Sequence, residues 1–418
     1  MRVVLIASSL AVLLFSFLFY WDENVTAEWV RWQNRYAAFL AETSSQRKAG
    51  WTFRVRQRQE FLPHLGRVDR CVSCHVGVEN PAMKGRPQPL ALHPGDLLDL
   101  HDLGQIGCTV CHDGQGRATS VKQAHALDHG VFFEKPILQA PMIEANCYRC
   151  HVAPLKRTPH YARGKRIFDT HGCRGCHRVN GDGGTQGPDL SRIGDASPHV
   201  KHASPQNQDR LAARFRGNEN VAYIYEAVRY PAAQPKNTLM FNLGFTDDEA
   251  IALTVYLKSL TEPVPGASII PRRTAKKPES LVERGKRLYL RYCVACHGPG
   301  ASGGRKNRNA IKESIPELRL LTEKLMLYEP KDVKTFVRAL REHGDLPKDG
   351  SSLDLPRPRV TRAQLKAIRG VIRNGNPSGK LDPKGPSPLN MPSWNRILDK
   401  GEITALIAYF VSEYPWDD

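Results

Sequence analysis

The feature that most constrains this chain is a short cysteine motif that occurs five times. In each copy two cysteines stand three positions apart, and a histidine directly follows the second cysteine. The copies run from Cys71 to His75, Cys108 to His112, Cys147 to His151, Cys173 to His177 and Cys293 to His297. Together they use all ten cysteines of the 418-residue chain. No cysteine is left for a disulfide or a free thiol outside these motifs.

A Cys-x-x-Cys pair has three common uses: half of a zinc site, a redox-active dithiol, or, when histidine follows at once, covalent attachment of haem. Neither zinc nor disulfide chemistry requires that histidine. With 15 histidines in 418 residues, five such coincidences would arise by chance at roughly 6 × 10⁻⁸. The motifs therefore predict five c-type haems, each held by two thioether bonds and by a proximal histidine on its iron.

We number the five predicted haem sites 1 to 5 in chain order. The cysteines expected to bind haem covalently are Cys71, Cys74, Cys108, Cys111, Cys147, Cys150, Cys173, Cys176, Cys293 and Cys296. The expected proximal iron ligands are His75, His112, His151, His177 and His297.

The N-terminus contains an uncharged run of 18 residues, 3–20, between Arg2 and the sequence Trp21-Asp22-Glu23. At about 1.5 Å per residue such a helix nearly spans the hydrocarbon core of a bilayer. Residues 1–21 are therefore predicted to be a single transmembrane anchor. The basic residue before the run and the acidic residues after it place the remaining chain on the periplasmic side of the cytoplasmic (inner) membrane. A signal peptide cleaved near Ala27 is the alternative.

The next two segments are expected to differ in character. Residues 22–62 are predicted to be an amphipathic helical segment, because Trp29, Trp32, Tyr36, Phe39 and Leu40 recur at three- and four-residue spacing. Its apolar stripe is expected either to pack within the protein or to contact a membrane surface or membrane subunit. Residues 63–158 contain sites 1–3. These sites are too closely spaced for each to have a separate fold, so the spacing predicts one loop-rich tri-haem module.

An internal repeat follows, in residues 159–262 and 280–418, with a Pro- and Lys-rich linker at 263–279. Gly164 and Phe168 precede site 4 in the same register as Gly285 and Tyr289 precede site 5. Each copy ends in an amphipathic helical pattern, and Thr246 is a candidate cap of the first of these helices.

Each repeat resembles a single-haem cytochrome c domain of the small all-α type. The resemblance implies that the glycine and aromatic of the first helix cross the last helix, and that a proline carbonyl supports the proximal histidine. Pro188 fits this proline well, and Pro316 fits it more loosely. It also implies a distal methionine ligand before the last helix, which is Met240 in the first repeat and Met391 in the second. Haem attachment outside the cytoplasm is a further implication.

Sites 1–3 have no methionine in a similar place, so histidine is the expected distal ligand. The stretch from residue 91 to 130 resembles the membrane-anchored multihaem cytochromes of bacterial quinol-oxidising (bc-type) complexes. On that resemblance the distal candidates are His93, His101, His125 and His129, ahead of His64 and His160. The sequence leaves open which of them serves which site.

The expected fold is mostly α, with an N-terminal transmembrane helix, a loop-rich tri-haem module and two all-α cytochrome c domains. Enough histidine and methionine are present to fill both axial positions of five irons, and a haem with both positions filled transfers electrons. The expected function is a penta-haem electron-transfer subunit rather than an enzyme. It would pass electrons from a membrane quinol-oxidising partner, cytochrome b-like or similar, to a periplasmic acceptor.

Two other functions remain open from the sequence. One is an anchored electron-donor subunit of a terminal oxidase or nitric oxide reductase, which tandem single-haem domains on an anchor resemble. The other is a multihaem redox enzyme of the peroxidase or nitrogen-oxide type. The net charge of +18 fits either an ordinary solvated basic surface or one that attracts acidic partners or anionic lipid. The basic runs lack interleaved aromatics, so nucleic acid is not an expected partner.

Overall fold

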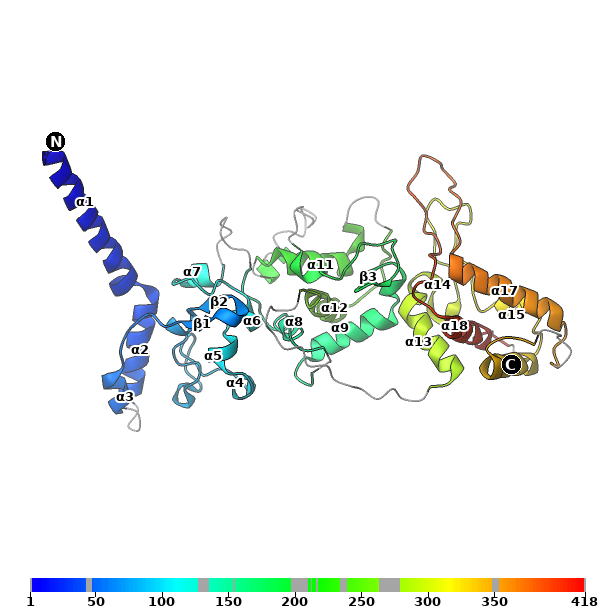
Figure 1. Cartoon of the computed structure of the whole chain (residues 1–418), viewed down its shortest axis with the longest axis horizontal. Helices are drawn as coiled ribbons and strands as arrows, with labels where there is room; N and C mark the ends of the chain where they lie inside the picture. Colours follow the sequence, from blue (N-terminus) through cyan, green and yellow to red (C-terminus); the bar gives the residue numbers. More distant parts are fainter. Residues whose placement is uncertain are drawn as a thin grey trace. The chain divides into compact units, whose positions relative to one another are not determined.

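A computed structural model describes residues 2–42, 47–126, 135–152, 155–196, 210–233 except 212 and 216, 239–262, 279–347 and 353–416. The chain divides into two compact units (Figure 1). The first is built mainly from residues 1–152, and the second mainly from 153–204, 223–261 and 271–418. Most of the predicted linker, 263–278, lies outside the described residues, as does His129.

The first unit begins with α1 (Arg2–Trp21), the long blue helix of Figure 1. Its described side chains are exposed throughout. Among the helices that the structure describes, this N-terminal one is long and apolar enough to cross a membrane. Exposure of so many large apolar side chains is unfavourable in water and suits a lipid environment.

The helical prediction for residues 22–62 is only partly correct. A short π-helical turn (Asp22–Thr26) leads into α2 (Glu28–Glu42), and α3 (Arg47–Thr52) ends the helical part. The backbone then runs without helix to a strand, because side chains satisfy its polar groups. The Gln33 amide bonds the Arg56 N–H at 3.0 Å and its C=O at 2.8 Å, and the Ser73 hydroxyl accepts the Arg58 N–H at 2.8 Å.

The apolar stripe of α2 packs within the first unit. Tyr36 and Leu40 are buried against Met83 and Leu90, and Trp29 is only 3% exposed. Of the two expectations for this stripe, internal packing is confirmed for these residues.

The rest of the first unit is loop-rich, as expected. A small antiparallel pair of strands, β1 (Glu60–Leu62) and β2 (Arg67–Asp69), was not foreseen. The helices after it are single turns. They are α4 (Leu97–Leu100), α5 (Leu103–Ile106), α6 (Thr109–His112), α7 (Val121–Ala124) and α8 (Glu144–Cys147).

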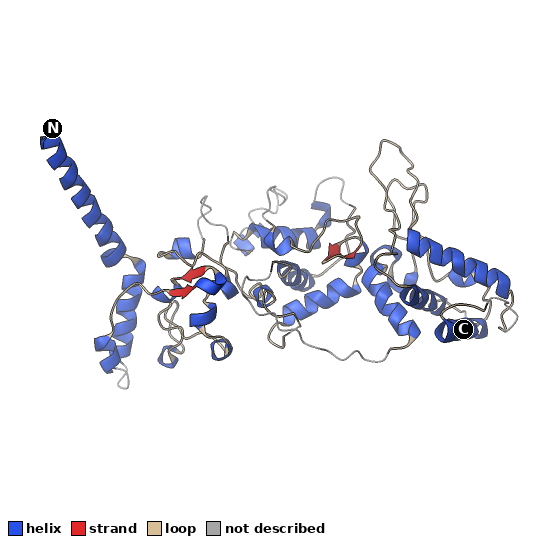
Figure 2. Cartoon of the chain, in the orientation of Figure 1, coloured by secondary structure: helices blue, strands red, loops and turns tan. Residues whose placement is uncertain are grey.

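The second unit contains two helical subdomains. The first has α9 (Pro159–Thr170) and two short paired strands, β3 (Arg178–Val179) and β4 (Asp182–Gly183). It continues with α11 (Glu219–Arg229), which belongs to this unit from residue 223, and ends with α12 (Asp247–Lys258). The second has α13 (Leu281–Tyr292), α14 (Val294–His297), α15 (Leu321–Lys324), α16 (Pro330–His343), α17 (Pro358–Asn374) and α18 (Lys400–Ser412). The mostly-α prediction is confirmed (Figure 2).

The first and last helices of each subdomain cross at a glycine. A Cβ on Gly164 would lie 1.9 Å from the Ala252 carbonyl oxygen, and one on Gly285 would lie 2.0 Å from that of Ala405. Only glycine permits so close an approach, and the helices lie side by side in Figure 1. Thr246 caps α12 in a capping box with Glu249, as predicted.

Candidate haem sites

All five cysteine motifs fold into the same turn. In each, the histidine N–H donates to the carbonyl of the first cysteine, at 2.9 Å in sites 1, 2, 4 and 5 and at 3.0 Å in site 3. This is one turn of α-helical hydrogen bonding, which the short spacing of the motif allows. The turn presents two sulfurs and one imidazole from a single short segment.

Three histidine pairs are formed in the first unit. The ring of His75 faces that of His125, His112 faces His93, and His151 faces His101. The distance between ring centroids is 6.3 Å in each pair, and the angles between ring planes are 30°, 78° and 85° in that order. Each pair joins one motif histidine to one of the predicted distal candidates.

This common distance fits two imidazoles on opposite sides of one iron. Two metal–nitrogen bonds of about 2.0 Å, plus about 1.15 Å from each nitrogen to its ring centre, give about 6.3 Å. The residues present therefore fit the group that the motifs predict. Rotation of either ring about the axis leaves this distance unchanged, so the different plane angles are compatible with it.

The electrostatics of these pairs favour neutral imidazole, the form that binds a metal. Burial, and then the nearby His125 and His112, lower the pKa of His75 to about 4. Burial also lowers the pKa of His112, with His93 adding to the effect, and the pKa of His151, with His101 adding to the effect.

Backbone carbonyls orient several of these rings, as is usual for histidine ligands. The backbone of Pro89 hydrogen-bonds the His75 ring, and the Leu97 carbonyl lies 3.0 Å from Nδ1 of His101. By contrast, the exposed His64 ring lies 2.9 Å from the Gln105 carbonyl, and His160 is exposed at the start of α9.

The sequence analysis missed the polar groups that join sites 1, 2 and 3. Buried Asp69, two residues before Cys71, accepts from the backbone N–H of Cys108 at 2.6 Å and of Thr109 at 2.8 Å. Buried Asp113, next to His112, pairs with Arg149 inside the site 3 motif at 2.9 Å. Their positions beside the motifs were the only signal in the sequence.

Sites 4 and 5 share one arrangement. Nδ1 of His177 lies 3.0 Å from the Pro188 carbonyl oxygen, and Nδ1 of His297 lies 3.0 Å from that of Pro316. Pro316, the looser match in sequence, thus makes the same contact as Pro188. Burial lowers the pKa of both histidines, and the proline carbonyls oppose that shift.

The two predicted distal methionines occupy different surroundings. Met240 precedes α12 and is 38% exposed. Met391 is partly buried against the apolar core of its subdomain and exchanges two backbone hydrogen bonds with Asn376, at 2.9 and 3.1 Å. Their ligand roles stay predictions.

Comparison with known families supports this arrangement. Residues 161–261 match the family described as cytochrome c, and residues 280–410 match the family described as cytochrome c oxidase, cbb3-type, subunit III. The chain is a multihaem c-type cytochrome. Comparisons of this cytochrome with curated proteins and with solved structures gave no match.

Neighbouring sites of the cytochrome touch through their cysteines. The Cys71 side chain neighbours that of Cys108, so sites 1 and 2 adjoin. Sites 2 and 3 meet where the Asn146 amide donates to the Cys111 carbonyl at 2.9 Å. In the second unit the Cys176 side chain neighbours that of Cys296. Consecutive attachment segments are therefore in contact within each unit.

Proposed function

We propose that this cytochrome is a penta-haem electron-transfer subunit, anchored in the cytoplasmic membrane by α1, with its haem domains in the periplasm. It carries electrons from a membrane quinol-oxidising partner, cytochrome b-like or similar, to a periplasmic acceptor. The observation that carries the proposal is the common 6.3 Å separation of three histidine pairs. Sites with both axial positions filled have no room for a substrate and suit electron transfer.

The ten motif cysteines would hold the haems, and the five motif histidines would be proximal ligands. The proposed distal ligands are His125 for site 1, His93 for site 2, His101 for site 3, Met240 for site 4 and Met391 for site 5. Bound haem would supply reversible one-electron transfer between Fe(II) and Fe(III). The chain's own task is to fix the ligands, keep water away and hold neighbouring sites in contact.

The ligands also suggest a direction. His/Met ligation raises a haem potential relative to His/His ligation. Sites 1–3, in the unit that carries the anchor, would then have lower potentials than sites 4 and 5. Electrons would enter at the tri-haem module and leave from the two cytochrome c domains.

A second function is favoured by one observation. The match of residues 280–410 to an oxidase subunit family supports an anchored electron-donor subunit of a terminal oxidase or nitric oxide reductase. The two functions differ in the partner, so isolation of the intact complex in mild detergent separates them. A quinol-oxidising partner supports the first, and an oxidase or reductase subunit supports the second.

Haem stoichiometry tests the proposed sites directly. The denatured mature protein should carry five covalent haems by pyridine haemochrome assay and should have no titratable thiol. Replacing Cys147 and Cys150 by alanine should lower the count by one. Four or fewer haems in the mature protein would contradict the proposal. A high-spin ferric haem signal would point instead to a redox enzyme.

A further inference from the structure

The two cytochrome c domains contact each other through their haem-attachment segments. A Cβ on Gly172, next to Cys173, would lie 2.6 Å from the Ala295 backbone nitrogen. A Cβ on Gly175, inside the site 4 motif, would lie 2.5 Å from the Tyr292 carbonyl oxygen. The backbone of the site 4 motif thus lies directly against the backbone at site 5.

The cysteine side chains meet at the same place. The side chains of Cys176 and Cys296 are neighbours, so the second thioether positions proposed for sites 4 and 5 adjoin. Each of these sulfurs marks the porphyrin edge that its site would hold.

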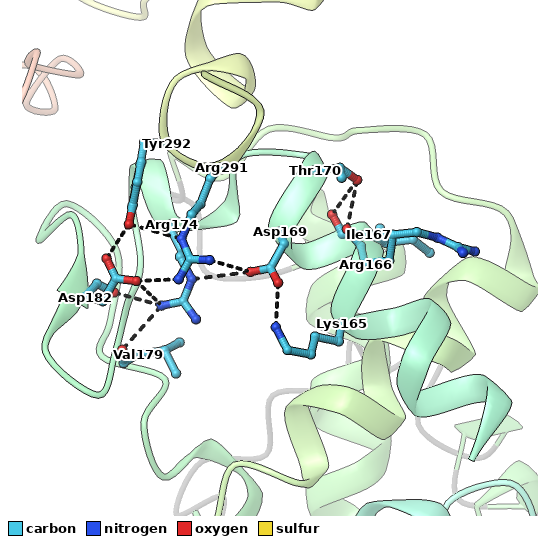
Figure 3. A network of polar contacts seen from close by, with 10 residues as sticks. All are labelled: Lys165, Arg166, Ile167, Asp169, Thr170, Arg174, Val179, Asp182, Arg291 and Tyr292. Atoms are coloured by element: carbon cyan, nitrogen blue, oxygen red, sulfur yellow. Dashed lines mark hydrogen bonds and ion pairs between the residues drawn. The ribbon is translucent and has the colours of Figure 1, made fainter. Parts of the chain in front are cut away.

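An ionic cluster beside this contact holds the domains together (Figure 3). Asp182 of the first domain accepts from Arg291 at 2.6 Å and from the Tyr292 hydroxyl at 2.7 Å, both from the second domain. Arg174, inside the site 4 motif, lies 3.3 Å from the same carboxylate. Paired charges that are partly removed from water fix an orientation more than loose surface pairs do.

Two further contacts join loops that flank the sites. The Gln186 side chain pairs with Asn390, donating to its carbonyl and accepting its N–H at 3.0 Å, which links the residue before Gly187-Pro188 to the residue before Met391. The Arg305 guanidinium lies 5.3 Å from the centroid of Phe241, the residue after Met240. The interface therefore includes loops that flank site 4 in the first domain and site 5 in the second domain.

We propose that the two cytochrome c domains form a single two-haem unit, joined edge to edge through the Cys176 and Cys296 segments and fixed by Asp182 with Arg291 and Tyr292. The inference rests on the proposed haem sites. As a consequence, the surface around the Cys176 and Cys296 segments is covered by the neighbouring domain and is not accessible to external partners. Electrons would enter site 4 and leave site 5 through other faces, and the two attachment segments would lie in direct contact between the sites. Asp182, Arg291 and Tyr292 are positioning residues.

Gly175→Ala is the sharpest test, because it places a methyl group against the Tyr292 carbonyl. The attachment chemistry should tolerate it, since site 5 has Ala295 at the equivalent position. In Soret circular dichroism, measured after reduction of the two high-potential haems alone, the unaltered protein should show an exciton couplet from sites 4 and 5. We expect Gly175→Ala to abolish this couplet. Backbone amide exchange over residues 292–296 should also accelerate. Gly370→Ala, where the Cβ would meet no atom within 4 Å, is the control and should change neither.

Arg291→Gln tests the same contact without altering a haem motif. It should weaken the couplet and accelerate the same amides, whereas Arg287→Gln, on the same helix but paired with Glu279 at 2.6 Å, should not. If Gly175→Ala prevents haem attachment at site 4, the comparison of Arg291→Gln with Arg287→Gln tests the contact between the domains instead.

The haem count separates failure of this inference from failure of the proposed function. Five haems with an unchanged couplet and unchanged exchange in Gly175→Ala and Arg291→Gln would overturn the edge-to-edge unit alone. Absence of haem from site 4 or site 5 in the unaltered protein would overturn the proposed sites, and this inference with them.

Discussion

Replacing His125 by methionine should raise the potential of site 1 without removing its haem. The 6.3 Å separation of the His75 and His125 rings leaves room for one iron with two bonds of about 2.0 Å. A thioether sulfur stabilises Fe(II) better than imidazole does. The expected rise is on the order of 100 mV, within the about 0.8 V that axial ligands span. For one electron this equals about 2.3 kcal/mol.

A spectroelectrochemical titration of the detergent-solubilised protein measures the change. One low-potential step should move upward, and the high-potential steps should stay in place. His64→Gln is the matched control, because His64 is exposed and lies against the Gln105 carbonyl rather than against a motif histidine. If His125→Met left every step unmoved, or if His64→Gln shifted one, the pairing argument would be wrong.

Four other outcomes are expected. In electron paramagnetic resonance, site 1 should give a rhombic low-spin signal, because the planes of its two histidine rings differ by 30°. Sites 2 and 3 should give strongly anisotropic low-spin signals, because their ring planes differ by 78° and 85°. Three signals of the same type would contradict these geometries. Gly285→Ala should destabilise the second domain by about 1–3 kcal/mol in thermal melts, since its Cβ would meet Ala405; an unchanged melt would refute the close crossing. Burial alone would raise the pKa of Asp182, but hydrogen bonds from Arg291 and Tyr292 and the charge of Arg174 bring it below its usual value. The stabilisation by the Asp182 carboxylate is therefore complete above about pH 4 and is lost as the pH falls through the lower pKa of the folded state. In Asp182→Asn, the melting temperature should depend less on pH below about pH 4. Met391→His should lower one high-potential step by on the order of 100 mV, and no shift would exclude Met391 as a ligand.

Much of the local structure could be predicted from the sequence because it depends on neighbours in the chain. The cap of α12 at Thr246 is one example. The helix crossings at Gly164 and Gly285 join distant segments and were implied instead by the resemblance of each repeat to a cytochrome c domain. The end of the helical segment at Thr52 and the strand pair β1–β2 could not be predicted. Both depend on partners distant in sequence, as when Gln33 binds the backbone of Arg56.

The same division applies to the sites. The sequence by itself determined the five attachment turns, since a Cys-x-x-Cys-His segment closes its own hydrogen bond within one helical turn. It also narrowed the distal residues of sites 1–3 to a few histidines. Only the tertiary structure decided that His125 faces His75 and that His101 faces His151. These rings are brought together by packing between segments about 50 residues apart, and no local pattern encodes that. The contact between Cys176 and Cys296, 120 positions apart, has the same origin: it forms where two folded domains meet.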